Sequence, residues 1–247
     1  MRTLVTLTAR NDHTYFNKYN HKLQGRLYND LKRRGHENIH RSEGPKCFSY
    51  SNIFPPRNAE EGDTRRFMFA STDEQLVTDV AYGLCSEPEI NIGPMAYEAE
   101  EAITLDPSIE ERGTLTTGTP IVLRMDAEYV REEGIDTGDY DRIYWRKEHG
   151  MDLFFDRLYS NLQSKYRAVY DEEAPEPPYF SGYSLDRSVA KPVSFADGDV
   201  EFIGGEWTFE YELQGQGHRR ILDLALDVGL GELNGLGFGF MNRGADV

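Results

Sequence analysis

One polar loop of the sequence gathers side chains that can transfer protons and hold negative charge. The stretch GHENIHRSEGPKCFSYSN, Gly35–Asn52, contains His36, His40 and Lys46. Histidine has an ordinary pKa of about 6.5, so it can take and give protons near neutral pH. A lysine ammonium can stabilise charge that develops on a reacting group. We prefer His40 as the acid/base residue, because His36 lies nearer the end of the preceding predicted helix and can serve as its cap. His149, in YWRKEHG, is a more distant candidate.

The C-terminal stretch GLGELNGLGFGFMN is unusually rich in glycine. Its glycines stand at Gly229, Gly231, Gly235, Gly237 and Gly239. Glycine inside regular structure costs about 0.5–1 kcal/mol relative to alanine, so five of them need a reason. A helix cap and a tight turn explain only one or two. Exposed backbone N–H groups can bind anions, so we predict that this loop contacts phosphates.

Two nucleotide-binding motifs do not fit the same stretch. A dinucleotide fingerprint requires a third glycine where Asn234 stands. The fingerprint also follows a strand, whereas this stretch follows a predicted helix. A Walker loop requires a GK[ST] sequence, which the chain lacks.

The overall charge is strongly acidic. The 247 residues include 43 acidic and 27 basic side chains, for a net charge of −16, and only seven of the basic residues are lysines. Such a charge argues against nucleic-acid binding when it is considered alone. High acidity with scarce lysine instead favours a protein adapted to molar salt, where the net charge reflects the solvent rather than the partner.

One predicted helix opposes this net charge. Residues 15–34 carry six basic side chains and the single acid Asp30. Lys18, Lys22 and Arg26 are four residues apart and are expected on one face, opposite an apolar stripe. A basic stripe on an otherwise acidic protein marks the side that we expect to face RNA or phosphate. In molar salt the screening length is only about 3 Å, so binding must depend on close, directional contacts.

The pattern of apolar residues predicts the elements that carry these side chains. In the first half we expect strands at Thr3–Leu7, Cys47–Phe54 and Thr64–Ser71 and within residues 90–105. We expect helices at 15–34 and after Ser71, Thr72 or Asp73, one of which caps the second helix. After a linker at Asp106–Gly113 the order repeats. The expected second-half elements are strands at Thr119–Met125, Ser188–Phe195, Glu206–Leu213 and Gly237–Asn242 and helices at Met151–Tyr170 and His218–Val228.

Twice over, this order is βαββαβ. We therefore predict an α+β chain of two tandem ferredoxin-like (RRM-like) domains, at residues 1–106 and 113–247. The two cysteines, Cys47 and Cys85, have no metal-ligand spacing, so we expect reduced thiols and neither a metal nor a cofactor. No stretch is apolar enough to cross a membrane, and the N-terminus does not resemble a signal peptide, so we expect a cytoplasmic protein.

The order of these motifs resembles a known family. A helix reading YNHKLQGRLYNDL, a loop with His40 and Lys46, the strand CFSYSNIFPP and the terminal GLGxxNGLGFGF are similar to the CRISPR repeat-processing endoribonucleases of the RAMP superfamily. The similarity spans the chain, is most specific in the glycine motif, and is greatest to acidic members from salt-loving archaea.

The resemblance implies a metal-independent cut in CRISPR repeat RNA. The 2′-OH attacks the adjacent phosphodiester and leaves a 2′,3′-cyclic phosphate and a 5′-OH. It implies that His40 is the general acid/base, that Lys46 stabilises the phosphorane and that Tyr28 assists catalysis. The same resemblance makes the glycine-rich loop an RNA contact, and it implies that the guide RNA can be passed to the interference complex. Arg219 and Arg220, at the start of the preceding predicted helix, are further candidates for phosphate contacts.

Two alternatives remain at this point. The first is a related RAMP-fold subunit that binds guide RNA without cutting it. The second is an acidic ferredoxin-like protein that binds no RNA, in which the basic helix and the glycine loop would lie on unrelated surfaces. The endoribonuclease hypothesis predicts that both face one groove between the domains.

The composition predicts that folding depends on salt. Carboxylates repel one another across an acidic surface, and salt screens this repulsion. We expect the far-ultraviolet circular dichroism of the native fold in molar KCl and its loss on dialysis to low salt. Loss of structure on moving into molar KCl would contradict the halophile interpretation.

Overall fold

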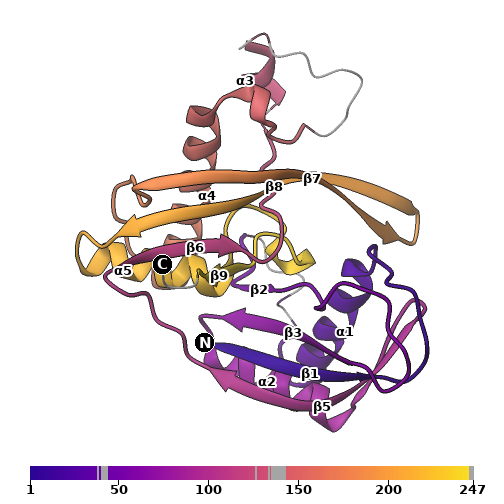
Figure 1. The fold of residues 1–247 in the computed structure, drawn as a ribbon. Helices are drawn as coiled ribbons and strands as arrows, with labels where there is room; N and C mark the ends of the chain where they lie inside the picture. The colour runs from indigo at the N-terminus through magenta and orange to yellow at the C-terminus, as the bar shows by residue number, and fades with distance from the viewer. Residues whose placement is uncertain (38, 40–43, 126, 133, 135–142, 245–247) are drawn as a thin grey trace.

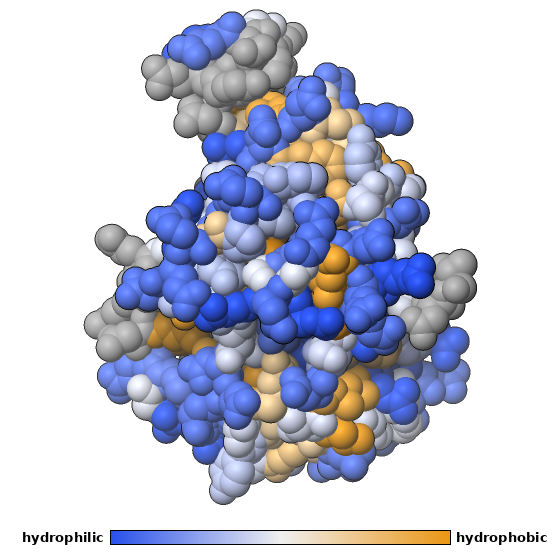
Figure 2. Space-filling model, turned by 90° about the vertical axis from the view of Figure 1, so that its left-hand side faces the viewer, coloured by the Kyte–Doolittle hydropathy of each residue, from blue (hydrophilic) through white to orange (hydrophobic). Residues whose placement is uncertain are grey.

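The computed structural model describes residues 1–37, 39, 44–125, 127–132, 134 and 143–244. Two antiparallel sheets, each covered by helices, lie one above the other in Figure 1. Hydrophilic residues cover most of the face shown in Figure 2. Among the helices in the described ranges, none is long and apolar enough to cross a membrane.

The N-terminal half, residues 1–105, forms a five-stranded sheet with the order β2-β3-β1-β5-β4. Alternate residues of the strands, such as Val5, Leu7, Phe67 and Phe69, form one core with the apolar faces of two helices. The elements of this half are β1 (Arg2–Ala9), α1 (Asn20–Arg33), β2 (Phe48–Tyr50), β3 (Thr64–Ser71), α2 (Glu74–Ser86), β4 (Glu89–Ile92) and β5 (Met95–Leu105).

The C-terminal half, residues 112–244, forms a four-stranded sheet with the order β7-β8-β6-β9. Trp207 is fully buried in its core and stacks on Phe154, with ring centroids 4.1 Å apart. The elements of this half are β6 (Arg112–Thr117), α3 (Ala127–Glu132), η1 (Lys147–His149), α4 (Met151–Tyr170), β7 (Gly182–Phe195), β8 (Gly198–Glu212), α5 (Gln216–Val228), η2 (Asn234–Leu236) and β9 (Met241–Arg243).

Both sheets have the ferredoxin-like strand order. The first strand of each half lies between the third and the last strand of its βαββαβ unit, and β4 is an extra edge strand. The predicted fold class is therefore confirmed. The chain passes from one sheet to the other between Leu105 and Arg112. This connection agrees with the predicted linker Asp106–Gly113, except that β6 already includes the last two residues of that linker.

Helix α1 begins at Asn20, five residues later than predicted. The preceding residues turn toward β7, where the Ser194 N–H donates to the Lys18 carbonyl at 3.2 Å. This bond takes the Lys18 carbonyl out of any helical pattern, so Lys18 precedes the helix instead of continuing its basic face. The start of α2 agrees with prediction, because the Asp73 carboxylate caps it by accepting from the N–H groups of Gln75 and Leu76.

Two predicted strands of the C-terminal half were misplaced. The first strand is β6, not Thr119–Met125, which makes only isolated bridges beyond the bend at residues 118–119. The last strand is β9, which begins only at Met241, because Gly237 and Gly239 in the first part of the predicted stretch have left-handed backbone angles. Positive φ angles are incompatible with a regular strand.

The glycine-rich segment, Gly229–Gly239, lies between the two halves. Its Gly237 has φ +83°, and a Cβ there would lie 2.5 Å from Cε2 of Tyr50 and 2.8 Å from Nδ2 of Asn20. Tyr50 is fully buried and its hydroxyl donates to the Asn20 carbonyl at 3.0 Å, so neither side chain can move aside easily. The missing side chain at Gly237 therefore lets the two halves of the chain approach each other.

Replacing Gly237 should destabilise the protein strongly. A positive φ and overlap with a buried ring together should lower the free energy of unfolding of Gly237→Ala by about 2–5 kcal/mol. The matched control is Gly25→Ala in α1, where a Cβ meets nothing within 4 Å. Higher helix propensity should raise that variant's stability by about 0.5–1 kcal/mol. Urea unfolding in molar KCl measures both, and equal midpoints for Gly237→Ala and the wild type would contradict this packing.

Candidate active site

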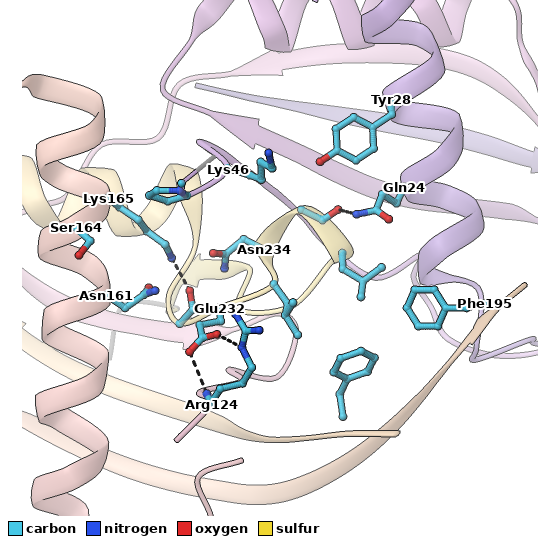
Figure 3. Close-up of a pocket in the computed structure, with 17 residues that line it drawn as sticks. Gln24, Tyr28, Lys46, Arg124, Asn161, Ser164, Lys165, Phe195, Glu232 and Asn234 are labelled. Carbon is cyan, nitrogen blue, oxygen red and sulfur yellow. Dashed lines mark hydrogen bonds and ion pairs between the residues drawn. The ribbon is translucent and has the colours of Figure 1, made fainter. Parts of the chain in front are cut away.

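A cavity of about 760 Å³ opens where the two halves meet (Figure 3). Helix α1 and the segment Gly44–Lys46 line it from the N-terminal half. Helix α4, Arg124, two phenylalanines of the β7–β8 hairpin and the glycine-rich segment line it from the C-terminal half. The cavity therefore exists only because both halves are folded and docked.

Direct hydrogen bonds join the wall of α1 to the glycine-rich segment. The Gln24 side-chain amide donates to the Gly235 carbonyl at 2.7 Å, and the Asn20 amide donates to the Leu236 carbonyl at 2.9 Å. A Cβ on Gly235 would lie 3.4 Å from the Tyr28 hydroxyl and 3.5 Å from Cγ of Lys46. The glycine-rich segment thus lies beside two of the three predicted catalytic residues.

Tyr28 and Lys46 both line the cavity. The Tyr28 ring packs edge-on against Phe48, and burial raises the pKa of its phenol, so Tyr28 is a neutral donor at neutral pH. The Lys46 ammonium donates to the Ile39 carbonyl at 2.9 Å. His40 lies outside the described residues, so its role as acid/base stays a prediction.

The other candidate histidines have structural partners away from this cavity. Nε2 of His36 lies 2.8 Å from Oδ2 of Asp79, which ties the end of α1 to α2. Nδ1 of His149 accepts the Arg146 N–H at 3.0 Å within the first turn of η1, and desolvation lowers the pKa of its imidazole. Neither histidine is among the described residues that line the cavity.

The predicted basic face of α1 is divided between structural roles. Lys18 forms an ion pair with Asp199 on β8. Arg26 pairs with the buried Asp30 at 2.9 Å and donates to the Glu87 carbonyl at 2.5 Å, which caps the end of α2. Lys22 is exposed. The helix reaches the cavity through Gln24 and Tyr28 instead, so RNA contact by Lys18, Lys22 and Arg26 stays a prediction.

Arg219 and Arg220 lie in the N-terminal part of α5, at the opposite end of that helix from the glycine-rich segment. Arg219 donates to the Ile109 carbonyl. Arg220 pairs with Glu172 at 2.6 Å, and its guanidinium lies 3.8 Å from the ring centroid of Tyr170. The two arginines precede Gly229 by ten and nine residues, about 13–15 Å along the helix axis, and neither lines the cavity. Phosphate contact by Arg219 and Arg220 stays a prediction.

The glycines themselves are mostly explained by the protein's own packing. All five are buried, and the spaces that side chains would need at Gly229, Gly231, Gly237 and Gly239 are filled by atoms of this chain. Only Gly231 and Gly235 line the cavity. The glycines therefore mainly allow other parts of the same chain to pack against this backbone. RNA contact is expected only where the segment lines the cavity.

Sequence reasoning missed three charged residues of this site. Lys165 on α4 is 2% exposed, and its ammonium donates to the carbonyls of Gly229 at 2.8 Å and Gly231 at 2.7 Å. Arg124 pairs with Glu232 at the cavity wall. One signal for Lys165 was present in the sequence, because it follows Leu158 and Leu162 on the apolar stripe of α4.

The charge of the cavity opposes that of the whole chain. Its described lining contains the basic residues Lys46, Arg124 and Lys165 and one acid, Glu232. A partly enclosed site with a basic excess attracts anions even when the net charge of the protein is −16. Phe195 and Phe202 add aromatic surface on which bases could stack. This combination suits a single-stranded polyanion.

Comparison with known proteins identifies relatives along the whole chain. The family described as "CRISPR associated protein Cas6, C-terminal" matches residues 103–243. A protein of Haloferax mediterranei named CRISPR-associated endoribonuclease Cas6 is 36% identical, over 98% of this chain and 93% of its own. A protein of Methanocaldococcus jannaschii named CRISPR-associated endoribonuclease Cas6 2 is 29% identical, over 98% and 99%.

Solved structures share the fold. One described as "CRISPR associated protein Cas6" superimposes with a TM-score of 0.76 at 17% identity and covers 99% of both chains. Another, described as "An RAMP protein binding different RNA substrates", gives a TM-score of 0.76 at 19% identity and covers 99% of this chain and 100% of its own. The resemblance predicted from the glycine motif and the first helix is confirmed. The chain belongs to the Cas6 family of CRISPR-associated endoribonucleases.

Proposed function

We propose that this protein cuts CRISPR repeat RNA by internal transesterification and without a metal ion. The observation that carries the proposal is the meeting of Tyr28, Lys46 and the glycine-rich segment in one basic cavity. The names of the curated relatives give the same reaction class. The same arrangement disfavours the alternative of an acidic ferredoxin-like protein that binds no RNA. In that protein, helix α1 and the glycine-rich segment would lie on unrelated surfaces.

The reaction needs two proton transfers and a compensated charge. A base takes the proton of the 2′-OH, and the 2′-oxygen then forms a bond to the neighbouring phosphorus. The bond from phosphorus to the 5′-oxygen breaks, and an acid gives that oxygen a proton. The products are a 2′,3′-cyclic phosphate and a 5′-OH. His40 is the proposed acid/base, and a positioned group of this kind contributes about 10²–10⁴-fold.

Lys46 and Tyr28 have the remaining roles. The Lys46 ammonium is proposed to offset the extra negative charge of the phosphorane, a contribution that preorganised cations make most strongly in a water-poor site. Tyr28, kept neutral by the raised pKa of its phenol, is proposed to donate a hydrogen bond to the scissile phosphate. Delivery of the product to an interference complex is a further proposal that rests on the family alone.

A cleavage assay tests the reaction and the choice of histidine. Wild type, His40→Ala and His36→Ala are incubated in EDTA and molar KCl with a labelled CRISPR-repeat RNA. The same RNA with a 2′-deoxy sugar at the cut site is the substrate control. We expect cleavage of the ribose substrate only, a loss of about 10²–10⁴-fold for His40→Ala, and near wild-type rates for His36→Ala, because its imidazole pairs with Asp79.

Other outcomes would each contradict a different part of the proposal. Cleavage of the 2′-deoxy RNA would exclude attack by the 2′-OH. Loss of activity in His36→Ala but not in His40→Ala would reverse the histidine assignment. Tight binding without cutting by the wild type would favour a guide-binding subunit that lacks catalysis.

A further inference from the structure

Lys165 is a buried lysine whose hydrogen bonds do not fully use its ammonium group. An ammonium has three N–H donors. Two of them donate to the carbonyls of Gly229 and Gly231, on either side of Leu230. Among the residues that the structure describes, no third acceptor lies within hydrogen-bond distance of Nζ. One donor is therefore available at the wall of the cavity that Lys165 lines.

The same ammonium has no carboxylate partner in the described part of the chain. Glu232, the acid of the cavity, pairs with Arg124 instead. A buried cation without a counter-ion is costly, and proteins keep such groups mainly at functional sites. Lys46 and Arg124 line the same cavity and add to the positive charge around Lys165. The missing counter-ion is therefore expected to come from a ligand.

A second unused polar atom lies one helical turn away. Oδ1 of Asn161, which also lines the cavity, is buried and has no hydrogen-bond partner among the described residues. Buried acceptors are nearly always satisfied in folded proteins, so this one is expected to accept from a donor group outside the described residues. A ribose hydroxyl beside a phosphate provides such a donor. Helix α4 thus presents one cationic donor and one acceptor to the same space.

We propose that Lys165 is a phosphate-binding residue for the RNA, with two N–H groups held on the glycine-rich segment and the third donated to one phosphate oxygen. The inference rests on the proposed function, because it takes repeat RNA to be the ligand of this cavity. It adds a contact from α4 to those expected from α1 and the glycine-rich segment. The anchor couples RNA binding to the conformation of the segment, since the same nitrogen holds both.

The proposal implies that RNA binding takes up a proton. Burial lowers the pKa of Lys165 to about 7, although Cys47 and Glu232 act to raise it. The Cys47 thiol is half-buried, and desolvation raises its pKa and keeps it neutral. A neutral amine still donates to both carbonyls, so the free protein loses little when the proton leaves. A bound phosphate favours the ammonium and should raise its pKa toward the ordinary value of about 10.4.

The test measures RNA affinity at two pH values. A fluorescent CRISPR-repeat RNA with a 2′-deoxy sugar at the cut site is titrated with protein in molar KCl at pH 7.5 and 8.5, and Kd is read from anisotropy. Wild type should bind close to tenfold more weakly at pH 8.5, because each proton taken up costs about tenfold in affinity per pH unit above the free pKa. Lys165→Met should weaken binding about tenfold to a hundredfold at pH 7.5 and should lose the dependence on pH.

Lys147→Met is the matched control, because Lys147 is exposed and does not line the cavity. It should keep both the affinity and the pH dependence of the wild type. A wild-type affinity that is independent of pH, or a pH dependence that persists in Lys165→Met, would overturn the proposal. Circular dichroism checks whether Lys165→Met folds. If it does not, the pH dependence of the wild-type affinity still tests the proposal. Cleavage is absent from this experiment, so an overturned anchor leaves the proposed reaction intact, whereas no binding by wild type at either pH would contradict RNA recognition itself.

Discussion

The close approach of the glycine-rich segment to the N-terminal half determines the rest of the structure. At Gly237 the backbone lies against Tyr50 and Asn20 with no room for a side chain. Hydrogen bonds from Gln24 and Asn20 then fix the carbonyls of Gly235 and Leu236. The N-terminal ammonium reinforces the docking through its ion pair with Asp227, 2.8 Å away at the end of α5. These contacts bring the loop that ends in Lys46 against a segment almost 200 residues later in the chain.

The junction between the two halves is also positively charged. The chain is strongly acidic, yet Lys46, Arg124 and Lys165 converge where the halves meet. In molar salt the screening length is about 3 Å, so charges farther apart than this interact little. The acidic surface then repels RNA only weakly, and the basic lining attracts it only at contact distance. An acidic exterior and an RNA-binding interior are therefore compatible in one protein. Ferredoxin-like halves serve many functions, so we assign the proposed reaction to the cavity that their docking creates rather than to the fold.

The sequence predicts elements where local pattern decides and fails where tertiary contacts decide. Helix α4 has the predicted bounds because its apolar residues recur with helical spacing over five turns. The predicted start of α1 and the predicted position of the first C-terminal strand were wrong, because a hydrogen bond from β7 to Lys18 and a bend at residues 118–119 override local propensity. Tyr28 and Lys46 were predicted through the family resemblance. Lys165 was not predicted, because the role of a lysine within an apolar stripe can be inferred only when its carbonyl partners are known.

One measurement tests whether a single cavity between the halves receives the RNA. A repeat RNA with 4-thiouridine next to the cut site is irradiated in complex with the protein in molar KCl, and the crosslinked peptides are identified by mass spectrometry. Because the cavity is lined by both halves, crosslinks should appear in residues 20–46 and in residues 229–239 of the same complex. Crosslinks confined to one half of the chain, or to surfaces remote from the cavity such as the first turn of α5, would contradict a shared site.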